Sequence, residues 1–264
     1  MNELSNIHYL NLIISYLLLI LPLSIIIWLK LPLLKPTLTG IVRMTAQLLF
    51  LGFYLQVIFK LNNPIVTALW LLVMIFVADI SIVRHTGLRL KFFLSPVAIG
   101  LLTGTLIPLV VFLYPVLQCS TLLPAQYAIP IGGMIMGNCM RANIVGIREF
   151  YTSVKSEEKV FLSRLAMGAT LFEALKHNLR SACSAALAPG IATMSTIGLV
   201  SIPGMMTGVI MGGNDPSEAI KYQIAIMLSI FCGTAITTFL VILLTIPKCF
   251  DSYGMLKKSI FAKK

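Results

Sequence analysis

The sequence contains few charged residues. Of its 264 residues, 9 are Asp or Glu and 20 are Lys or Arg, so 11% are charged and 58% are hydrophobic. Soluble domains average about 25% charged and about 45–50% apolar residues. No charged residue occurs between Lys91 and Arg141. This composition excludes a sizeable soluble domain and predicts an integral membrane protein.

The motifs of an ATPase and of a catalytic or metal centre are also lacking. There is no G-x-x-x-x-G-K-[S/T] phosphate-binding loop, so the chain cannot hydrolyse ATP by that route. Its five cysteines include no C-x-x-C pair, and His8, His85 and His177 lie far apart, outside the apolar runs. We therefore expect a chain that is not an enzyme and binds no cofactor itself, and the sequence assigns no metal ligands. A membrane-embedded enzyme stays an alternative, with Asp79 and Arg141 as its candidate reactive groups.

Seven apolar runs are long enough to cross a bilayer, whose hydrocarbon core of about 30 Å requires roughly 20 residues of helix. The runs are residues 9–29, 41–59, 64–83, 95–117, 127–146, 182–201 and 222–246. They predict an all-α integral membrane protein of about seven transmembrane helices, folded as a single domain over residues 1–264. The count is open by one, because a helix break at Pro203 leaves residues 203–213 free to re-enter the membrane.

The distribution of Lys and Arg predicts the orientation. With the N-terminus outside, only Lys60 and Lys221 of the 20 basic residues fall in outer segments, and Lys263 and Lys264 of the tail fall inside. Basic residues gather in cytoplasmic loops, so we expect an outer N-terminus and a cytoplasmic C-terminus. The same bias explains the net charge of +11. The expected partner is therefore the lipid bilayer and not nucleic acid.

Residues 148–180 form the longest charged segment and are expected to be a cytoplasmic loop. Within it, the pattern predicts two short helices that meet at Gly168, and Thr170 and Glu173 have the spacing of a capping box. Such an elbow would present Leu171, Phe172 and Leu175 to a partner protein. The pattern alone fits an amphipathic helix on the membrane surface equally well.

Two polar residues within early apolar runs are candidates for a transport pathway. Asp79 lies near the inner end of its run, and ionisable groups in spans tend to face a cavity or a partner. It is interpreted as a cation or proton site, or as the partner of Arg84 in an ion pair. Gln47 is the second candidate, with a hydrogen bond between helices as the alternative.

Further pathway candidates lie in the later runs. Asn138 and Arg141 are three residues apart on one helix face, and Asn143 is near them. Arg141 would repel a bare metal cation, so it suits an anionic or chelated substrate, or a structural bond to carbonyl groups.

The segment around Pro203 supplies the remaining candidates, which are Pro203, Gly204, Met205 and Met206. A helix break at membrane depth persists only where it is buried in protein or lines water. Thioethers bind soft metals such as Cu(I), but methionine is also a common apolar filler.

Three strings resemble one family over nearly the whole chain. These strings are IPIGGMIMGN, RLAMGATLFEALKHNLRSA and GLVSIPGMMTGVIMGGNDPSEAIKYQI, and they resemble the FetB-type permease family of ABC transporters. The second string also looks like the coupling loop of ABC permeases. Members of this family are linked to iron export in bacteria, and plant relatives are linked to aluminium tolerance.

The resemblance implies a homodimeric permease that exports a metal ion such as iron and works with a separate ATP-binding subunit, which uses the ATP. It places the ATPase-docking surface on the elbow, at Arg164, Gly168, Ala169, Thr170, Leu171, Phe172 and Glu173. The rival interpretation is a secondary transporter in which Asp79 carries protons. That transporter would work without any ATPase.

Overall fold

The computed structural model describes residues 9–251 and 253–260, and the regular elements in these ranges are all helices, accompanied by two isolated β-bridges. His8, Lys263 and Lys264 lie outside the described residues. The described chain confirms the prediction of an all-helical fold. It divides into two compact units, residues 1–61 with 211–214 and residues 62–210 with 215–264.

The first unit contains α1 (Tyr9–Leu17), α2 (Ile20–Trp28) and α3 (Leu34–Leu61). The apolar run at 9–29 is therefore two short helices, and the prediction of one continuous helix there was wrong. Pro22 explains the break, because its ring displaces the carbonyl group four residues earlier, at Leu18. The hydroxyl groups of Tyr16 and Thr45 form a hydrogen bond of 2.6 Å within this unit.

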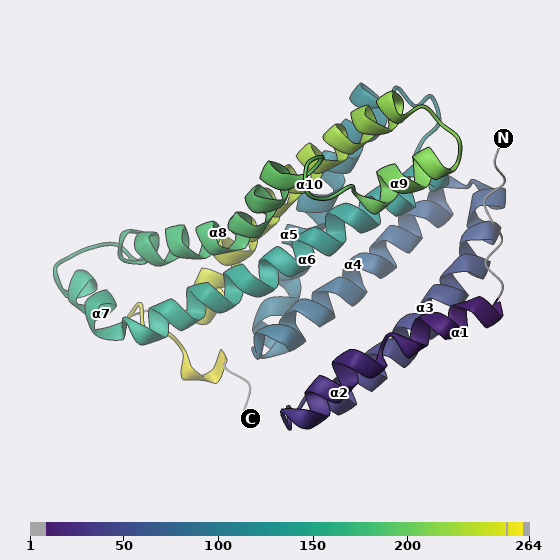
Figure 1. The fold of residues 1–264 in the computed structure, drawn as a ribbon. Coiled ribbons are helices and arrows are strands. Elements are labelled where there is room, and N and C mark those ends of the chain that lie inside the picture. Colours follow the sequence, from purple (N-terminus) through teal and green to yellow (C-terminus); the bar gives the residue numbers. More distant parts are fainter. Residues whose placement is uncertain (1–8, 252, 261–264) are drawn as a thin grey trace. The chain divides into compact units, whose positions relative to one another are not determined.

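The second unit contains the remaining helices, drawn in Figure 1. They are α4 (Pro64–Thr86), α5 (Leu90–Val111) with the π-helical turn η1 (Phe112–Val116), α6 (Ala125–Ser156), α7 (Glu158–Ala166), α8 (Leu171–Thr196), α9 (Gly204–Met211), α10 (Pro216–Cys249) and the 3₁₀ turn η2 (Lys258–Ile260). Among the described residues of both units, four helical segments are long and apolar enough to cross a membrane, namely α3, α4, α5 with η1, and α10.

Local sequence signals fix the starts of two spanning helices. Asn63 accepts a hydrogen bond from the backbone N–H of Ile65 at 2.9 Å, and Pro64 follows at the first helical position of α4. Asp215 caps α10 in the same way through the N–H of Ser217, also at 2.9 Å. These caps satisfy backbone donors that have no partner inside the helix.

The segment 148–180 is helical over most of its length, which corrects the expectation of a loop with two short helices. α6 continues without interruption to Ser156, and α8 begins at Leu171 and runs for 26 residues into the next apolar run. Phe150, Tyr151 and Val154 on the extended part of α6 are buried. Because this charged stretch still has one apolar face, the helix persists beyond the apolar run that was used to predict its end.

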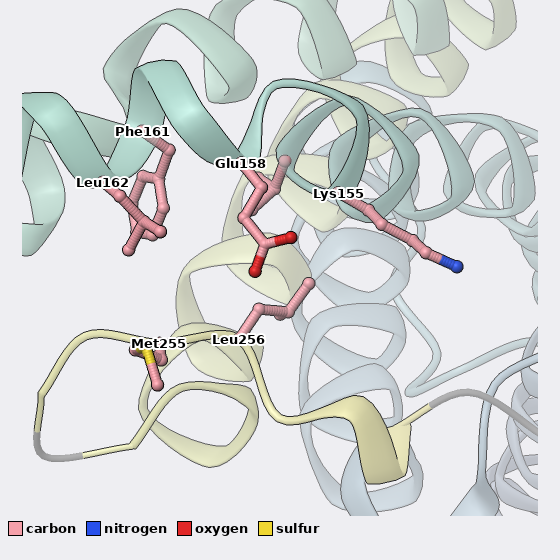
Figure 2. Close-up of a pocket in the computed structure, with 7 residues that line it drawn as sticks. Lys155, Glu158, Phe161, Leu162, Met255 and Leu256 are labelled. Atoms are coloured by element: carbon pink, nitrogen blue, oxygen red, sulfur yellow. The ribbon is translucent and has the colours of Figure 1, made fainter.

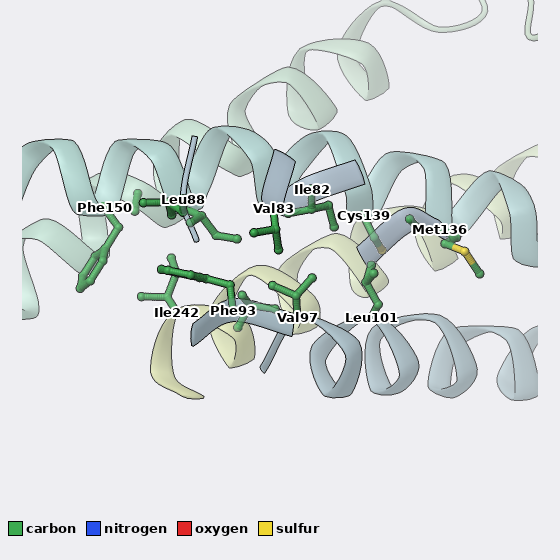
Figure 3. Packing of buried hydrophobic residues seen from close by; sticks show 14 of the residues in the cluster. Ile82, Val83, Leu88, Phe93, Val97, Leu101, Met136, Cys139, Phe150 and Ile242 are labelled. Carbon is green, nitrogen blue, oxygen red and sulfur yellow. The ribbon is translucent and has the colours of Figure 1, made fainter. Parts of the chain in front are cut away.

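The core of the second unit lies among α4, α5, α6 and α10. Figure 3 shows Val83 of α4, Val97 of α5 and Ile242 of α10 converging there, and all three are almost completely buried. Gly104 and Gly233 let α5 and α10 approach closely. A Cβ atom on Gly104 would lie 2.8 Å from the carbonyl oxygen of Gly233 and 2.7 Å from Cβ of Thr237. Contact of this kind between small residues is a common way of packing helices in membranes.

We predict that Gly104→Ala lowers the thermal unfolding midpoint in detergent, because a methyl group would push backbone against backbone. Overpacking typically costs about 1–3 kcal/mol. Gly137→Ala on α6 is the matched control, since nothing lies within 4 Å of its Cβ position. Circular dichroism melts would check this, and equal midpoints for the two variants would contradict the assigned α5–α10 contact.

Candidate functional site

A cavity of about 370 Å³ opens between α6, α8 and α10. Its described lining consists of Asn138, Arg141, Ala142, Val145, Ala186, Leu187, Pro189, Gly190, Thr193, Met194, Met227, Ile230, Phe231 and Thr234. The volume falls within the usual range of small-molecule pockets, about 300–1,000 Å³. Two of the predicted pathway residues, Asn138 and Arg141, therefore lie together at one cavity.

Asn138 orients the guanidinium group of Arg141. The Arg141 Nη2 donates to Oδ1 of Asn138 at 3.1 Å, while Nδ2 of Asn138 donates to the carbonyl oxygen of Met134 at 2.8 Å. Asn138 is half-buried and Arg141 is exposed. Arg141 forms no ion pair with a described carboxylate. Its remaining N–H groups are thus available to a ligand.

Asn143 points away from this cavity into the core. It is fully buried and donates from Nδ2 to the carbonyl oxygen of Cys139 at 2.8 Å and to the Thr237 hydroxyl at 3.1 Å. The second bond ties α6 to α10 beside the close glycine contact. Asn143 lies two residues after Arg141, which is about 200° around a helix, so the two face opposite sides.

Asp79 is fully buried on α4. Neither of its carboxylate oxygens has a hydrogen-bond partner among the described residues, and the ion pair expected as an alternative with Arg84 is not formed. Burying a carboxylate without a partner is costly, and such groups in membrane spans tend to have a functional role. Asp79 is not among the residues that line the cavity.

The elbow between α7 and α8 is built from two consecutive capping motifs. Gly168 has a φ of +89°. Its backbone N–H donates to the carbonyl oxygen of Leu165 at 3.0 Å, and the backbone N–H of Ala169 donates to the carbonyl oxygen of Arg164 at 3.1 Å. This is the Schellman pattern that ends a helix. The Thr170 hydroxyl then accepts from the N–H of Glu173 at 3.3 Å, which starts α8.

Glu173 completes the predicted capping box. Its carboxylate accepts the Thr170 hydroxyl at 2.7 Å and the Thr170 backbone N–H at 2.8 Å. These hydrogen bonds, the one from the hydroxyl first, lower the pKa of Glu173 below its ordinary value of 4.5. The elbow is therefore a defined turn and not an irregular loop.

The elbow leaves part of its apolar surface uncovered. Met167 is 79% exposed and Phe172 is 50% exposed, whereas Leu171 is half-buried. Leu175 is 1% exposed, so its expected role as an apolar contact for a partner was wrong. Its position four residues after Leu171 places it on the inner face of α8. Arg164 is turned inward as well, and donates to the carbonyl oxygen of Ala174 at 3.1 Å.

The C-terminal segment packs beneath this elbow. The rings of Phe161 and Phe250 lie 5.9 Å apart, and the backbone N–H of Arg89 donates to the carbonyl oxygen of Ile260 at 2.9 Å. A second cavity, of about 400 Å³, lies between α7 and this segment. Figure 2 shows its lining residues, with Glu158 directed toward Leu256. The packing of Phe250 against Phe161 braces α7, and no local sequence pattern indicates this brace, because the two residues are distant along the chain.

The segment around Pro203 forms a short helix between two turns. Pro203 directly precedes α9, whose eight residues span about 12 Å, too short to cross a bilayer. Met205, Met206 and Gly204 belong to this helix, and none of them lines the cavity. Gln47 lies on α3, in the first unit. The described residues contain no group of three or more His, Cys, Asp or Glu side chains placed to hold a metal ion.

Comparison with known proteins identifies the family. Residues 9–250 match the family described as "Uncharacterised protein family (UPF0014)". The chain belongs to the UPF0014 family. No solved structure matches this UPF0014 protein.

Relatives cover most of the UPF0014 chain. The "Probable iron export permease protein FetB" of Escherichia coli is 33% identical over 89% of this chain and 89% of its own length. The "Protein ALUMINUM SENSITIVE 3" of Arabidopsis thaliana is 32% identical over 83% of this chain and 79% of its own. A "UPF0014 membrane protein YjkA" of Bacillus subtilis is 29% identical over 85% of this chain and 88% of its own.

For Asp79, we predict that Asp79→Asn keeps or raises the thermal unfolding midpoint of this UPF0014 protein. An uncharged amide of similar shape avoids the cost of burying a carboxylate that has no described partner. Asp79→Lys is the destabilising control. A clear fall in the midpoint of the Asn variant would show that the carboxylate has a stabilising partner in the folded protein.

At the elbow, we predict a loss of order in acid. The lowered pKa of Glu173 means that its stabilisation is complete above pH 4.5 and is lost as the pH falls through the lowered pKa. Hydrogen exchange of residues 168–176, corrected for intrinsic rates, should therefore accelerate below that pH. Glu173→Gln keeps the capping-box acceptor without a titrating group, so the corrected hydrogen exchange of the same residues in this variant should not change with pH. Equal acid sensitivity in both proteins would refute the assignment.

Proposed function

We propose that this chain is the permease subunit of an ATP-binding-cassette transporter. In this proposal a separate ATPase subunit docks on the elbow at residues 164–180 and drives the export of a metal ion such as iron. The active unit would contain two permease chains and two ATPase subunits in a bacterial inner membrane, with the elbow in the cytoplasm. The observation that carries the proposal is that one helix, α8, begins at the elbow and lines the cavity.

α8 connects the two places directly. It begins at the elbow with Leu171 and lines the cavity with Pro189. Eighteen residues separate these two, which corresponds to about 27 Å of helix, close to the thickness of the hydrocarbon core. Figure 1 shows α7 at one end of the second unit and α9 near the other, with α8 running between them. A push on the elbow would therefore move one wall of the cavity.

α6 is coupled to α8 near the elbow. Asn178 of α8 donates to the Ser153 hydroxyl at 3.1 Å and to the Glu157 carboxylate at 3.3 Å. Ser181 donates to Glu149 at 3.3 Å. Because these bonds join the two helices, α6 and its Arg141 would follow a displacement of α8.

A partner protein is supported by the exposed surface of the elbow and by the sequence. Phe172 and Met167 present apolar area on a rigid turn, which suits insertion into a groove of another protein. The chain has no phosphate-binding loop, so it needs an external source of energy. The printed name of the FetB relative, an iron export permease, supports the choice of iron and of export.

Asp79 favours a second candidate, a proton-coupled secondary transporter. Its buried carboxylate has no described hydrogen-bond partner, as expected for a group that takes up and releases a proton. This candidate predicts transport in vesicles that contain the permease alone. The ATPase-driven transporter predicts none until the ATPase subunit and ATP are added.

We predict that Phe172→Asp abolishes the stimulation of ATP hydrolysis by the permease in a reconstituted complex. A charged side chain would have to be desolvated in the apolar groove of the partner. Gly168→Pro should have the same effect, because proline cannot adopt the positive φ at this position.

Phe172→Leu is the control for this experiment and should retain stimulation, since it keeps an apolar side chain. Both Phe172 variants should show the unfolding midpoint and helix content of the unmodified protein. Full stimulation by Phe172→Asp would contradict docking at the elbow.

A further inference from the structure

The polar groups at the cavity between α6, α8 and α10 differ from those of a metal-ion site. Arg141 is the one charged residue in its described lining, and no Asp, Glu, His or Cys is present there. Iron and other hard cations prefer carboxylate or imidazole ligands. A bare dication would also be repelled by the guanidinium group.

The free hydrogen-bond donors in the described lining of this cavity belong to Arg141 and Asn138. Oδ1 of Asn138 accepts from Arg141. The hydroxyl groups of Thr193 and Thr234 donate to carbonyl oxygens of their own helices, at 2.9 Å and 2.8 Å, which leaves them only as acceptors. The donors that remain for a ligand are the fork of N–H groups on Arg141 and the second amide hydrogen of Asn138. A planar guanidinium fork matches the two oxygens of a carboxylate or phosphate.

We infer that this cavity binds an oxyanion, so that a metal exported through it travels as a complex with carboxylate or phosphate ligands and not as a bare cation. The inference rests on the proposed function for the metal, but the oxyanion site itself does not require the ATPase. Asn138 is a positioning residue, because it holds the guanidinium in place. The cavity volume of about 370 Å³ also suits a small organic complex better than a single ion.

The experiment measures binding to the full-length chain in lipid nanodiscs before any ATPase is added. Equilibrium dialysis would compare citrate, ferric citrate, inorganic phosphate and anaerobic ferrous ion. We expect ferric citrate or one of the free oxyanions to bind, and ferrous ion alone to bind at least tenfold more weakly. Preference for ferric citrate over citrate would identify a metal complex, and the reverse would identify a free organic anion.

Variants of Arg141 assign the site. Arg141→Gln should weaken oxyanion binding at least tenfold, and Arg141→Lys should have an intermediate effect because it keeps the charge without the fork. Arg148→Gln is the matched control, as it lies two turns further along α6, is exposed and does not line the cavity, so it should stay within twofold. Asn138→Ala should weaken binding less than Arg141→Gln.

Several outcomes would overturn the oxyanion site. They are the absence of binding by all three oxyanion probes, ferrous binding that matches theirs, or oxyanion binding unchanged in Arg141→Gln. Failure of the proposed function has a different signature. Oxyanion binding would then persist and depend on Arg141, while ATP and the ATPase subunit would have no effect on transport.

Discussion

The continuity of α6 and α8 as single helices of 32 and 26 residues is the constraint on which the rest of the second unit depends. Within a bilayer each backbone N–H and C=O group must find its partner inside the protein, so these helices cannot end in the apolar region without a cost. α8 begins at the elbow, and α6 ends at Ser156, with only the short helix α7 between it and the elbow. Because a helix is stiff along its axis, the elbow and the cavity wall become two ends of the same element. The Asn178 bonds to Ser153 and Glu157 then make two helices respond together.

Close packing on the opposite side of the bundle complements this arrangement. The contact of Gly104 with Gly233 and the bond of Asn143 to Thr237 fix α10 against α5 and α6. α8, by contrast, buries its apolar face mainly toward the elbow end, at Leu175, Leu179 and Ala182. Its later turns line the cavity. The helix that carries the elbow is therefore more deeply buried near the elbow than at the cavity.

The sequence predicted those features that depend on local chemistry. The capping box of Thr170 and Glu173 was predicted because it is completed within three residues. The grouping of Asn138 with Arg141 followed from helical spacing. The break between α1 and α2 was missed because hydropathy does not register Pro22, although its chemistry supplies the signal. The extent of α6 was missed for another reason, since its charged face hid the buried stripe of Phe150 and Val154.

Features built from distant contacts could not be predicted in this way. The brace beneath the elbow joins Phe161 to Phe250, and no local pattern in either segment indicates the other. The solvent exposure of Leu175 was also misjudged. Its spacing from Leu171 places both residues on one face of α8, but whether that face is exposed or buried depends on which elements pack against it. Pairings across the bundle require the fold itself.

The two ionisable groups singled out in the apolar runs occupy opposite environments, and this separation bears on the transport mechanism. Asp79 is enclosed in the α4 side of the core without a described partner, whereas Arg141 stands at an accessible cavity with its geometry fixed by Asn138. Had the two formed an ion pair, each would have neutralised the other and the cavity would have carried no net charge. Kept apart, Arg141 retains its full charge for a ligand. In the proposed oxyanion site this charge would let the cavity discriminate ligands by the sign of their charge, which a pocket of neutral side chains could not do.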